Sequence, residues 1–292
     1  MAQAAIARWG RVAAGGQDVS TLVFGQTGQV ARALQEQADV TALGRDVADL
    51  RDPAACARAI RDHAPNVVIN AAAYTAVDRS EEDSDTAMQV NGATPAVMAQ
   101  TCADLGIPFL HISTDYVFDG HGSTPWRPDD PTDPQNTYGR SKLLGEQGVR
   151  AAGGRFVILR TSWVFSAQGA NFVTTMLGLS ETRDSLNVVD DQIGGPTPAA
   201  DIAATLLVMA HALQDGAEGG IYHYAGGPDT SWAGFAREIF AQTDSAVTVH
   251  GIPTSDYPTA AMRPLNSRLD CSTTMRDFGV STCNWRKGLA TV

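Results

Sequence analysis

A tyrosine and a lysine four residues apart, in the segment Tyr138-Gly-Arg-Ser-Lys142, form the strongest chemical signal in the sequence. In a helix this spacing places both side chains on one face. A lysine ammonium beside a phenol stabilises the phenolate and lowers the tyrosine pKa from its usual value of about 10. The pair therefore predicts proton exchange with a carbonyl or an alcohol near neutral pH, and the lysine can also hold a cofactor ribose.

A hydroxyl pair, Ser113-Thr114, lies at the end of the apolar run 108–113, which reads as a strand. The Thr114 hydroxyl can hydrogen-bond the same substrate oxygen that Tyr138 addresses. Because ligands bind at the carboxyl ends of parallel strands, we expect Thr114 to share one edge of a sheet with Gly25 and Ala73.

A glycine-rich turn, Gly25-Gln-Thr-Gly28-Gln-Val-Ala31, follows the first apolar run and opens a helical segment. Glycines in this position allow a tight turn and let a pyrophosphate approach the amides of a helix N-terminus. The alternative is a plain structural turn. The predicted cofactor contacts of this turn are Gly25, Gln26, Thr27, Gly28, Gln29 and Val30.

The second strand ends in Leu43-Gly44-Arg45, without the acid that usually binds an unphosphorylated ribose. A guanidinium can hold a 2′-phosphate in a bidentate manner, so Arg45 favours NADP(H), while NAD(H) stays possible and a solvated loop arginine is the alternative. Asp49 and Leu50 are placed for adenine contacts. The small residues of Asn70-Ala-Ala-Ala-Tyr-Thr75 indicate either close packing or a cofactor lying against the backbone, with contacts from Ala72, Ala73, Tyr74 and Thr75.

The elements that must position these residues alternate between strand and helix. Strands are predicted at 20–24, 40–43, 66–70, 108–113 and 156–159, and helices at 29–37, 53–63, 82–105 (broken or kinked by Pro95) and 138–150. This alternation predicts an α/β fold, a Rossmann-type doubly wound parallel sheet. Further helices are expected near 169–180, 198–213 and 231–242, with strands near 186–189, 220–224 and 246–251.

Three parts of the chain are predicted from this order. Residues 1–18 form a flexible extension, and residues 19–162 form the NAD(P)-binding domain, whose sheet is completed by parts of 186–225. Residues 163–292 form mainly a smaller C-terminal α/β lobe for the substrate.

The composition argues against nucleic-acid-binding, membrane-spanning, zinc-binding and secreted proteins. The 292 residues carry 21 Lys+Arg and 32 Asp+Glu, a net charge of -11, which argues against nucleic acid and anionic membranes as partners. The longest apolar stretch, 202–213, is shorter than the roughly 20 residues of a membrane span. Four scattered cysteines without a CxxC pair predict neither zinc nor disulfides, and the N-terminus lacks a signal-peptide core. We expect a cytoplasmic protein.

Taken together, these motifs resemble the extended short-chain dehydrogenase/reductase superfamily and, within it, the dTDP-4-dehydrorhamnose reductase family. The resemblance covers about residues 20–285 and rests on six segments, 24–34, 70–81, 112–120, 160–165, 190–203 and 263–270. It implies reduction of the C4 ketone of dTDP-4-dehydro-L-rhamnose to dTDP-L-rhamnose by NADPH or NADH.

The resemblance also implies roles for individual residues. Tyr138 donates the proton, Lys142 lowers its pKa and holds the ribose, and Thr114 hydrogen-bonds near the reacting oxygen. Trp163 matches a sugar-contacting tryptophan or is a packed aromatic. The remaining substrate candidates are Asp115 and Tyr116, which line the pocket, and Arg263 and Arg268, which bind the diphosphate or form internal ion pairs.

Departures from the family pattern leave some properties open. Ala33 stands where some members have a glutamate that helps hold magnesium at a dimer interface, so we expect no metal site and a monomer or weak homodimer. Gly44 stands where some members have an acid, which leaves the cofactor open. The alternatives are another sugar-nucleotide 4-ketoreductase or epimerase, or a non-catalytic NADP-binding regulatory subunit.

Overall fold

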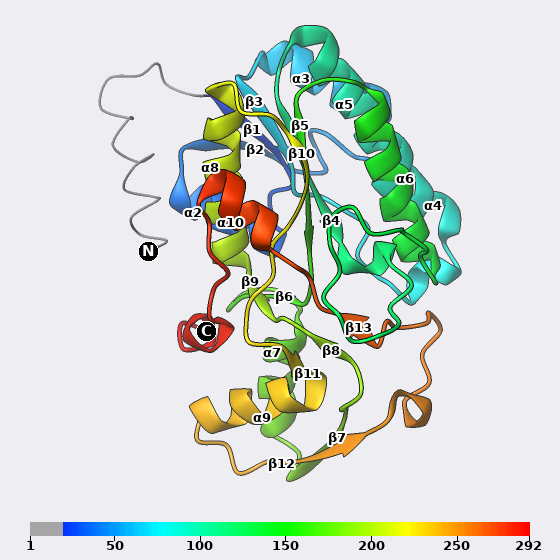
Figure 1. The fold of residues 1–292 in the computed structure, drawn as a ribbon, viewed down its shortest axis with the longest axis vertical. Coiled ribbons are helices and arrows are strands. Elements are labelled where there is room, and N and C mark those ends of the chain that lie inside the picture. Colours follow the sequence, from blue (N-terminus) through cyan, green and yellow to red (C-terminus); the bar gives the residue numbers. More distant parts are fainter. Residues whose placement is uncertain (1–19) are drawn as a thin grey trace.

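A six-stranded parallel sheet organises the larger part of the molecule in the computed structural model, which describes residues 20–292 (Figure 1). The expected extension at residues 1–18 lies outside the described residues. The strand order is β2-β1-β3-β4-β5-β10, all parallel, so the order reverses between β1 and β3. The strands are β1 (Thr21–Phe24), β2 (Val40–Leu43), β3 (Val67–Asn70), β4 (Phe109–Thr114), β5 (Phe156–Thr161) and β10 (Gly220–His223).

Helices cover both faces of this sheet (Figure 1). One face carries α3 (Pro53–His63), α5 (Thr94–Leu105) and α6 (Thr137–Ala151), and the other carries α2 (Gln29–Gln37), α8 (Ala199–Gln214) and α10 (Ser272–Phe278). This is the doubly wound arrangement that the alternation of elements predicts.

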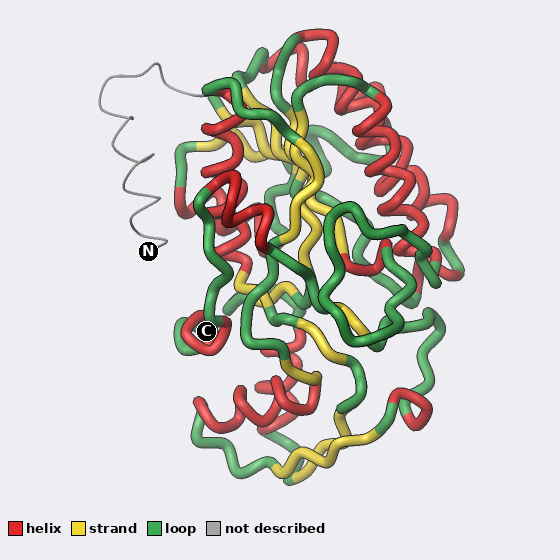
Figure 2. Tube along the Cα trace, in the orientation of Figure 1, coloured by secondary structure: helices red, strands yellow, loops and turns green. Residues whose placement is uncertain are grey.

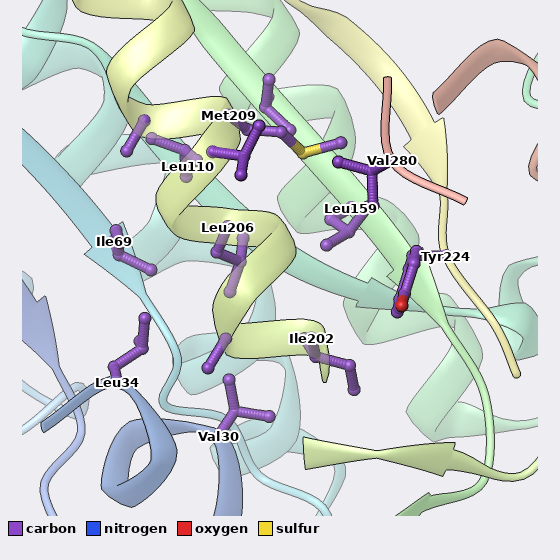
Figure 3. Packing of buried hydrophobic residues seen from close by; sticks show 14 of the residues in the cluster. Val30, Leu34, Ile69, Leu110, Leu159, Ile202, Leu206, Met209, Tyr224 and Val280 are labelled. Atoms are coloured by element: carbon purple, nitrogen blue, oxygen red, sulfur yellow. The ribbon is translucent and has the colours of Figure 1, made fainter. Parts of the chain in front are cut away.

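Alternate residues of each strand supply the two layers of core. On β1, Val23 packs with α2 and α8, whereas Leu22 and Phe24 pack with α3 and α5. Figure 3 shows the first of these layers, in which Ile202, Leu206 and Met209 of α8 lie over the sheet. Burial on both faces explains why the strands read as continuous apolar runs.

The smaller lobe lies beyond the carboxyl ends of the strands (Figure 2). Its core joins Phe165, Phe235 and Trp285, which are fully buried. Its elements are β6 (Val164–Phe165), α7 (Phe172–Ser180), β7 (Ser185–Val189), β8 (Ile193–Gly194), β9 (Thr197–Pro198), β11 (Thr230–Ser231), α9 (Trp232–Gln242), β12 (Thr248–Ile252), the 3-10 turn η5 (Thr254–Asp256), β13 (Asn266–Ser267) and α11 (Trp285–Leu289). Strand β7 pairs with β12, β6 with β9, and β8 with both β11 and β13.

The chain passes between the two parts more than once. Strand β10 and helices α8 and α10 belong spatially to the large sheet although they follow residue 163. The helix expected at 82–105 is divided into α4 (Ser84–Met88), a π-helical stretch η3 (Gln89–Ala93) and α5, with a 3-10 turn η2 (Arg79–Glu81) before them. The backbone stays helical through these joins, and the π-helical stretch precedes Pro95, which lies in the first turn of α5. Among residues 20–292, no helix is long and apolar enough to cross a membrane.

Candidate active site

The predicted site residues gather at the carboxyl edge of the large sheet. Gly25 follows β1, Arg45 follows β2, and 71–75 follow β3. Thr114 ends β4, and it is in register with Thr161 at the end of β5. Ligands of doubly wound sheets bind at this edge, at the point where the strand order reverses.

The glycine turn after β1 has the geometry of a phosphate-binding turn. Gly25 has φ +110°, and a Cβ there would lie 3.3 Å from the backbone of Ala71 and Ala72. Gly28 caps α2, and a Cβ on it would meet no described atom within 4 Å, so the start of the helix is open. The free amides of a helix N-terminus attract anions. These residues fit a dinucleotide pyrophosphate.

The loop after β2 holds Arg45 and Asp49, which differ in whether their side chains already have a partner within the protein. The Arg45 side chain is exposed and makes no hydrogen bond or ion pair within the described chain. The carboxylate of Asp49 is already paired with Arg51 at 2.5 Å, and this guanidinium lowers the pKa of Asp49. Leu50 is buried, and its carbonyl accepts from Thr94 at 2.5 Å. Arg45 is therefore the group that remains available to a further phosphate.

The loop after β3 is fixed by an asparagine in the π-helical stretch. Asn91 accepts from the amide of Tyr74 at 2.8 Å and donates to its carbonyl at 2.9 Å. The same Nδ2 donates to Ser141 of α6 at 3.0 Å. Asn91 thus joins the small-residue loop to the helix that carries the tyrosine and lysine. Stretches of π-helix occur frequently at functional sites.

Helix α6 begins with an ordered cap that places Tyr138 in its first turn. Asn136 accepts from the amide of Gly139 at 2.7 Å, and Thr137 donates twice to Glu81, at 2.8 and 2.9 Å. A Cβ on Gly139 would lie 2.2 Å from the carbonyl oxygen of Tyr116, so only glycine permits this approach. Tyr138 and Tyr116 meet edge to face, with ring centroids 5.5 Å apart.

The Tyr138 phenol is held in its protonated form. Burial raises its pKa to about 12, the charge of Asp115 adds to this, and the Thr114 hydroxyl opposes it. The Lys142 amine contacts the carbonyl of Ile112 and the ring of His111. Its expected lowering of the phenol pKa stays a prediction.

Lys142 is buried and turned toward the sheet. Its Nζ lies 2.6 Å from the carbonyl oxygen of Ile112 and 3.2 Å from Nε2 of His111. Burial lowers the pKa of Lys142 to about 8, and Glu146 opposes this shift. Burial also lowers the pKa of His111, so this histidine is neutral.

Asp115 is a further buried group at the site whose pKa is shifted from its ordinary value. It is 2% exposed, and its Oδ1 accepts from the Thr114 hydroxyl at 3.0 Å. Burial raises its pKa to about 6, with smaller opposing effects of the Ser267 and Thr114 hydroxyls. Its Oδ2 and the nearby Ser267 hydroxyl are buried without a well-formed hydrogen bond in the described chain. Unsatisfied polar atoms at such a position are available to a polar ligand.

One helical turn beyond Lys142, Glu146 forms a closed ion pair with Arg160 of β5. The two side chains are 2% and 3% exposed, and Nη2 lies 2.6 Å from Oε2. Arg160 Nε and the Ser113 hydroxyl both donate to Oε1, at 2.9 and 2.6 Å. Arg160 also lies over the ring of Phe118, 4.9 Å from its centroid. This pair anchors α6 to two strands.

The remaining substrate candidates are engaged within the protein. Trp163 has φ +49°, and its ring stacks on Trp232 with centroids 3.6 Å apart. Arg263 pairs with Asp78 at 2.6 Å, although its Nη1 is buried without a partner in residues 20–292. Arg268 contacts Asp229 at 3.4 Å and Asn266 at 2.9 Å. Of the two alternatives for these arginines, the structure has internal ion pairs.

Sequence reasoning missed His111, Asn91 and Glu146. Glu146 continues the four-residue spacing of Tyr138 and Lys142, which is a readable signal of a shared helix face. His111 and Asn91 carry no motif, because their roles depend on contacts between elements distant in sequence.

Comparison with known proteins places this site in a family. The family model of the RmlD substrate binding domain matches residues 19–292. A dTDP-4-dehydrorhamnose reductase of Burkholderia thailandensis is 45% identical over 282 residues, covering 91% of this chain and 95% of that protein. The chain belongs to the dTDP-4-dehydrorhamnose reductase family. As a member it is an oxidoreductase of the short-chain dehydrogenase/reductase superfamily.

Solved structures of dTDP-4-dehydrorhamnose reductases share the fold. That from Clostridium acetobutylicum is 36% identical, with a TM-score of 0.87 and coverage of 93% of this chain and 97% of that one. The structure from Bacillus anthracis, in complex with NADP, is 32% identical, with a TM-score of 0.87 and coverage of 94% and 98%. The fold and the sequence thus support the same family.

Proposed function

We propose that the chain reduces the C4 ketone of dTDP-4-dehydro-L-rhamnose to dTDP-L-rhamnose, with NADPH as the favoured cofactor. The observation that carries this is the position of buried Tyr138 beside Thr114, at the sheet edge that also holds the glycine turn. Relatives named for this reaction, at up to 45% identity over nearly the whole chain, supply the substrate.

The chain's own residues fit a nicotinamide dinucleotide. The Gly25–Gly28 turn and the open start of α2 would hold the pyrophosphate, the loop 72–75 would lie along the cofactor, and Arg45 would take a 2′-phosphate. When bound, the cofactor supplies a hydride to the C4 carbon of the sugar. The related enzyme of Bacillus anthracis binds NADP, which supports this choice.

Tyr138 is the proposed proton donor to the oxygen at C4. A phenol with a pKa of about 12 is protonated at neutral pH, which suits the reducing direction. Thr114 donates a hydrogen bond near the same oxygen, and Lys142 holds the cofactor ribose. Asp115, Tyr116 and Trp163 line the sugar pocket in this proposal.

Substrate turnover and a single variant test the proposal. Purified protein is incubated with the 4-keto sugar nucleotide and either NADPH or NADH, loss of cofactor absorbance is followed, and the product is identified by NMR. We expect dTDP-L-rhamnose, with NADPH preferred. Tyr138→Phe should lower kcat by a factor of about 10² to 10⁴ while leaving NADPH binding intact. A product epimeric at C4, or a Tyr138→Phe variant with the wild-type rate, would refute the assignment.

A further inference from the structure

A buried chain of hydrogen bonds behind the catalytic residues determines where protons lie. It runs from the amide of Ala72 through Asn70 of β3 and His111 of β4 to the amine of Lys142 on α6. Asn70, His111 and Lys142 are all at most 2% exposed, so water does not complete their hydrogen bonds. The donors and acceptors must therefore match one another.

The orientation of this hydrogen-bond chain is fixed at its Ala72 end. The Ala72 amide can only donate, and it lies 3.2 Å from Oδ1 of Asn70. This orients the Asn70 side chain so that its Nδ2, which can only donate, lies 3.1 Å from Nδ1 of His111. Nδ1 must then be the accepting nitrogen of the ring. A neutral imidazole carries one proton, so it is assigned to Nε2.

This tautomer presents an N–H to the amine of Lys142, 3.2 Å away. A neutral amine accepts a hydrogen bond from that N–H through its lone pair and still donates to the Ile112 carbonyl at 2.6 Å. An ammonium has no lone pair, so it would face the His111 N–H without a hydrogen bond. With the ring proton on Nδ1, that N–H would face the donating Nδ2 of Asn70. With the Asn70 amide also turned, its Nδ2 would face the donating amide of Ala72.

We infer that His111, oriented by Asn70, is a positioning residue that favours the neutral amine of Lys142 over its ammonium in the free enzyme, and that cofactor binding raises the affinity of Lys142 for a proton. The inference rests on the proposed function, because it requires Lys142 to hold the cofactor. The ammonium finds no acceptor at His111, so an acceptor on the cofactor would favour the protonated form.

Among the charged groups around Lys142, Glu146 favours the ammonium and so opposes the preference for the neutral amine. On its own helix, Tyr138 is a neutral phenol, and Glu146 is neutralised by Arg160 of β5. Burial raises the pKa of Asp115, which follows β4, to about 6. The downward shift of the Lys142 pKa by burial acts in the same direction as the hydrogen bonds.

The lysine content of the chain makes the test direct, because Lys142 and Lys287 are its only lysines. Protein labelled with ¹³C-lysine gives two side-chain signals, of which the exposed Lys287 is an internal reference. We expect Lys142 in the free enzyme to titrate at or below about pH 8, against about 10.4 for an ordinary solvated lysine. A Lys142 midpoint within about half a unit of that of the reference signal overturns the inference.

A variant separates the role of His111 from burial alone. The glutamine in His111→Gln can turn its carbonyl oxygen toward an ammonium, so the Lys142 midpoint should rise by at least about one unit. His250→Gln, at an exposed histidine, is the matched control and should leave it unchanged. An unchanged midpoint in folded His111→Gln would show that His111 only packs.

Two measurements on the unaltered protein keep the inference testable if that variant does not fold. ¹⁵N-histidine spectra should place the His111 proton on Nε2, and a proton on Nδ1 refutes the inference. Calorimetry of NADPH binding at pH 9, in buffers of different ionisation enthalpy, should show uptake of up to about one proton, and none refutes it. Turnover and its loss in Tyr138→Phe do not depend on these results, so failure here leaves the proposed function standing.

Discussion

The inward face of α6 carries two buried polar centres that differ in how completely their hydrogen bonds are satisfied. At the anchoring centre, Glu146 is bound by Arg160 and Ser113, and both of its oxygens have partners. At the reactive centre, one turn away, Lys142 and Asp115 have displaced pKa values, and Asp115 Oδ2 lacks a partner in the described chain. A single helix can thus combine a centre that holds the fold together with one that retains unmet hydrogen bonds for a ligand.

Removing charge at the anchoring centre should have the largest effect on stability. Glu146→Gln leaves Arg160 buried without its counter-charge, which costs about 3–5 kcal/mol of the free energy of unfolding. Urea unfolding at pH 7 measures this. Glu181→Gln, on an exposed residue, is the control and should change stability by less than about 0.5 kcal/mol. A loss below about 1 kcal/mol for Glu146→Gln would remove the distinction between the centres.

Removing the Lys142 charge at the reactive centre should raise stability near pH 7, by an amount that depends on pH. The pKa of Lys142 is about 8 in the folded state, against an ordinary value of 10.5, so the unfolded chain binds more protons between these values. The contribution of Lys142 to stability therefore rises with pH across this window, by up to about 3 kcal/mol. Lys142→Met should be more stable than the wild type near pH 7.

Unfolding of both proteins at several pH values tests this sign. The advantage of Lys142→Met should shrink between about pH 8 and 10.5, while turnover is lost throughout. A constant difference between the two proteins would mean that Lys142 is not titrating in the folded state.

The two centres also differ in their carboxyl groups, because Glu146 is paired with Arg160 whereas Asp115 has a raised pKa. Its pKa is about 6 in the folded state, against an ordinary value of 3.8, so it stabilises the fold below about pH 4 and loses this contribution as pH rises to 6. Asp115→Asn should therefore gain about 2 kcal/mol at pH 7 relative to pH 4. Thermal unfolding at the two pH values checks this, and equal differences at both would contradict it.

The last comparison concerns two hydroxyls at the ends of adjacent strands, one of which should contribute nothing to stability. Ser113→Ala removes a donor to Glu146 and should cost about 1–3 kcal/mol. Thr161→Val removes a buried hydroxyl that has no partner in the described chain, so its stability should be unchanged or slightly higher. Equal losses in urea unfolding would show that both hydroxyls are satisfied.

The sequence was sufficient for the elements that repeat a local pattern. The alternation of strands and helices predicted the parallel sheet, and comparison with known proteins confirmed the fold class and the family. The proline was expected to break or kink the helix at 82–105, and the structure has a π-helical stretch just before Pro95. These features depend on nearest neighbours and periodicity, which a sequence displays directly.

The direction of Lys142 could not be read in the same way. The four-residue spacing places Lys142 and Tyr138 on one helix face, yet the amine turns toward Ile112 and His111 of β4. Which neighbour a long side chain contacts depends on packing between α6 and the sheet. The partners of Arg263 and Arg268 were open for the same reason, because Asp78 and Asp229 lie far away in sequence.

The late position of β10 has a consequence for synthesis of the chain on the ribosome. This strand pairs with β5, but its first residue, Gly220, follows Thr161 only after a large part of the smaller lobe has been made. The core beneath α2 likewise waits for α8. Pairing between strands so distant along the chain is slow, because the intervening segment loses conformational entropy before the stabilising contacts form. The nascent protein must therefore carry an unfinished sheet edge until about three quarters of its residues have emerged.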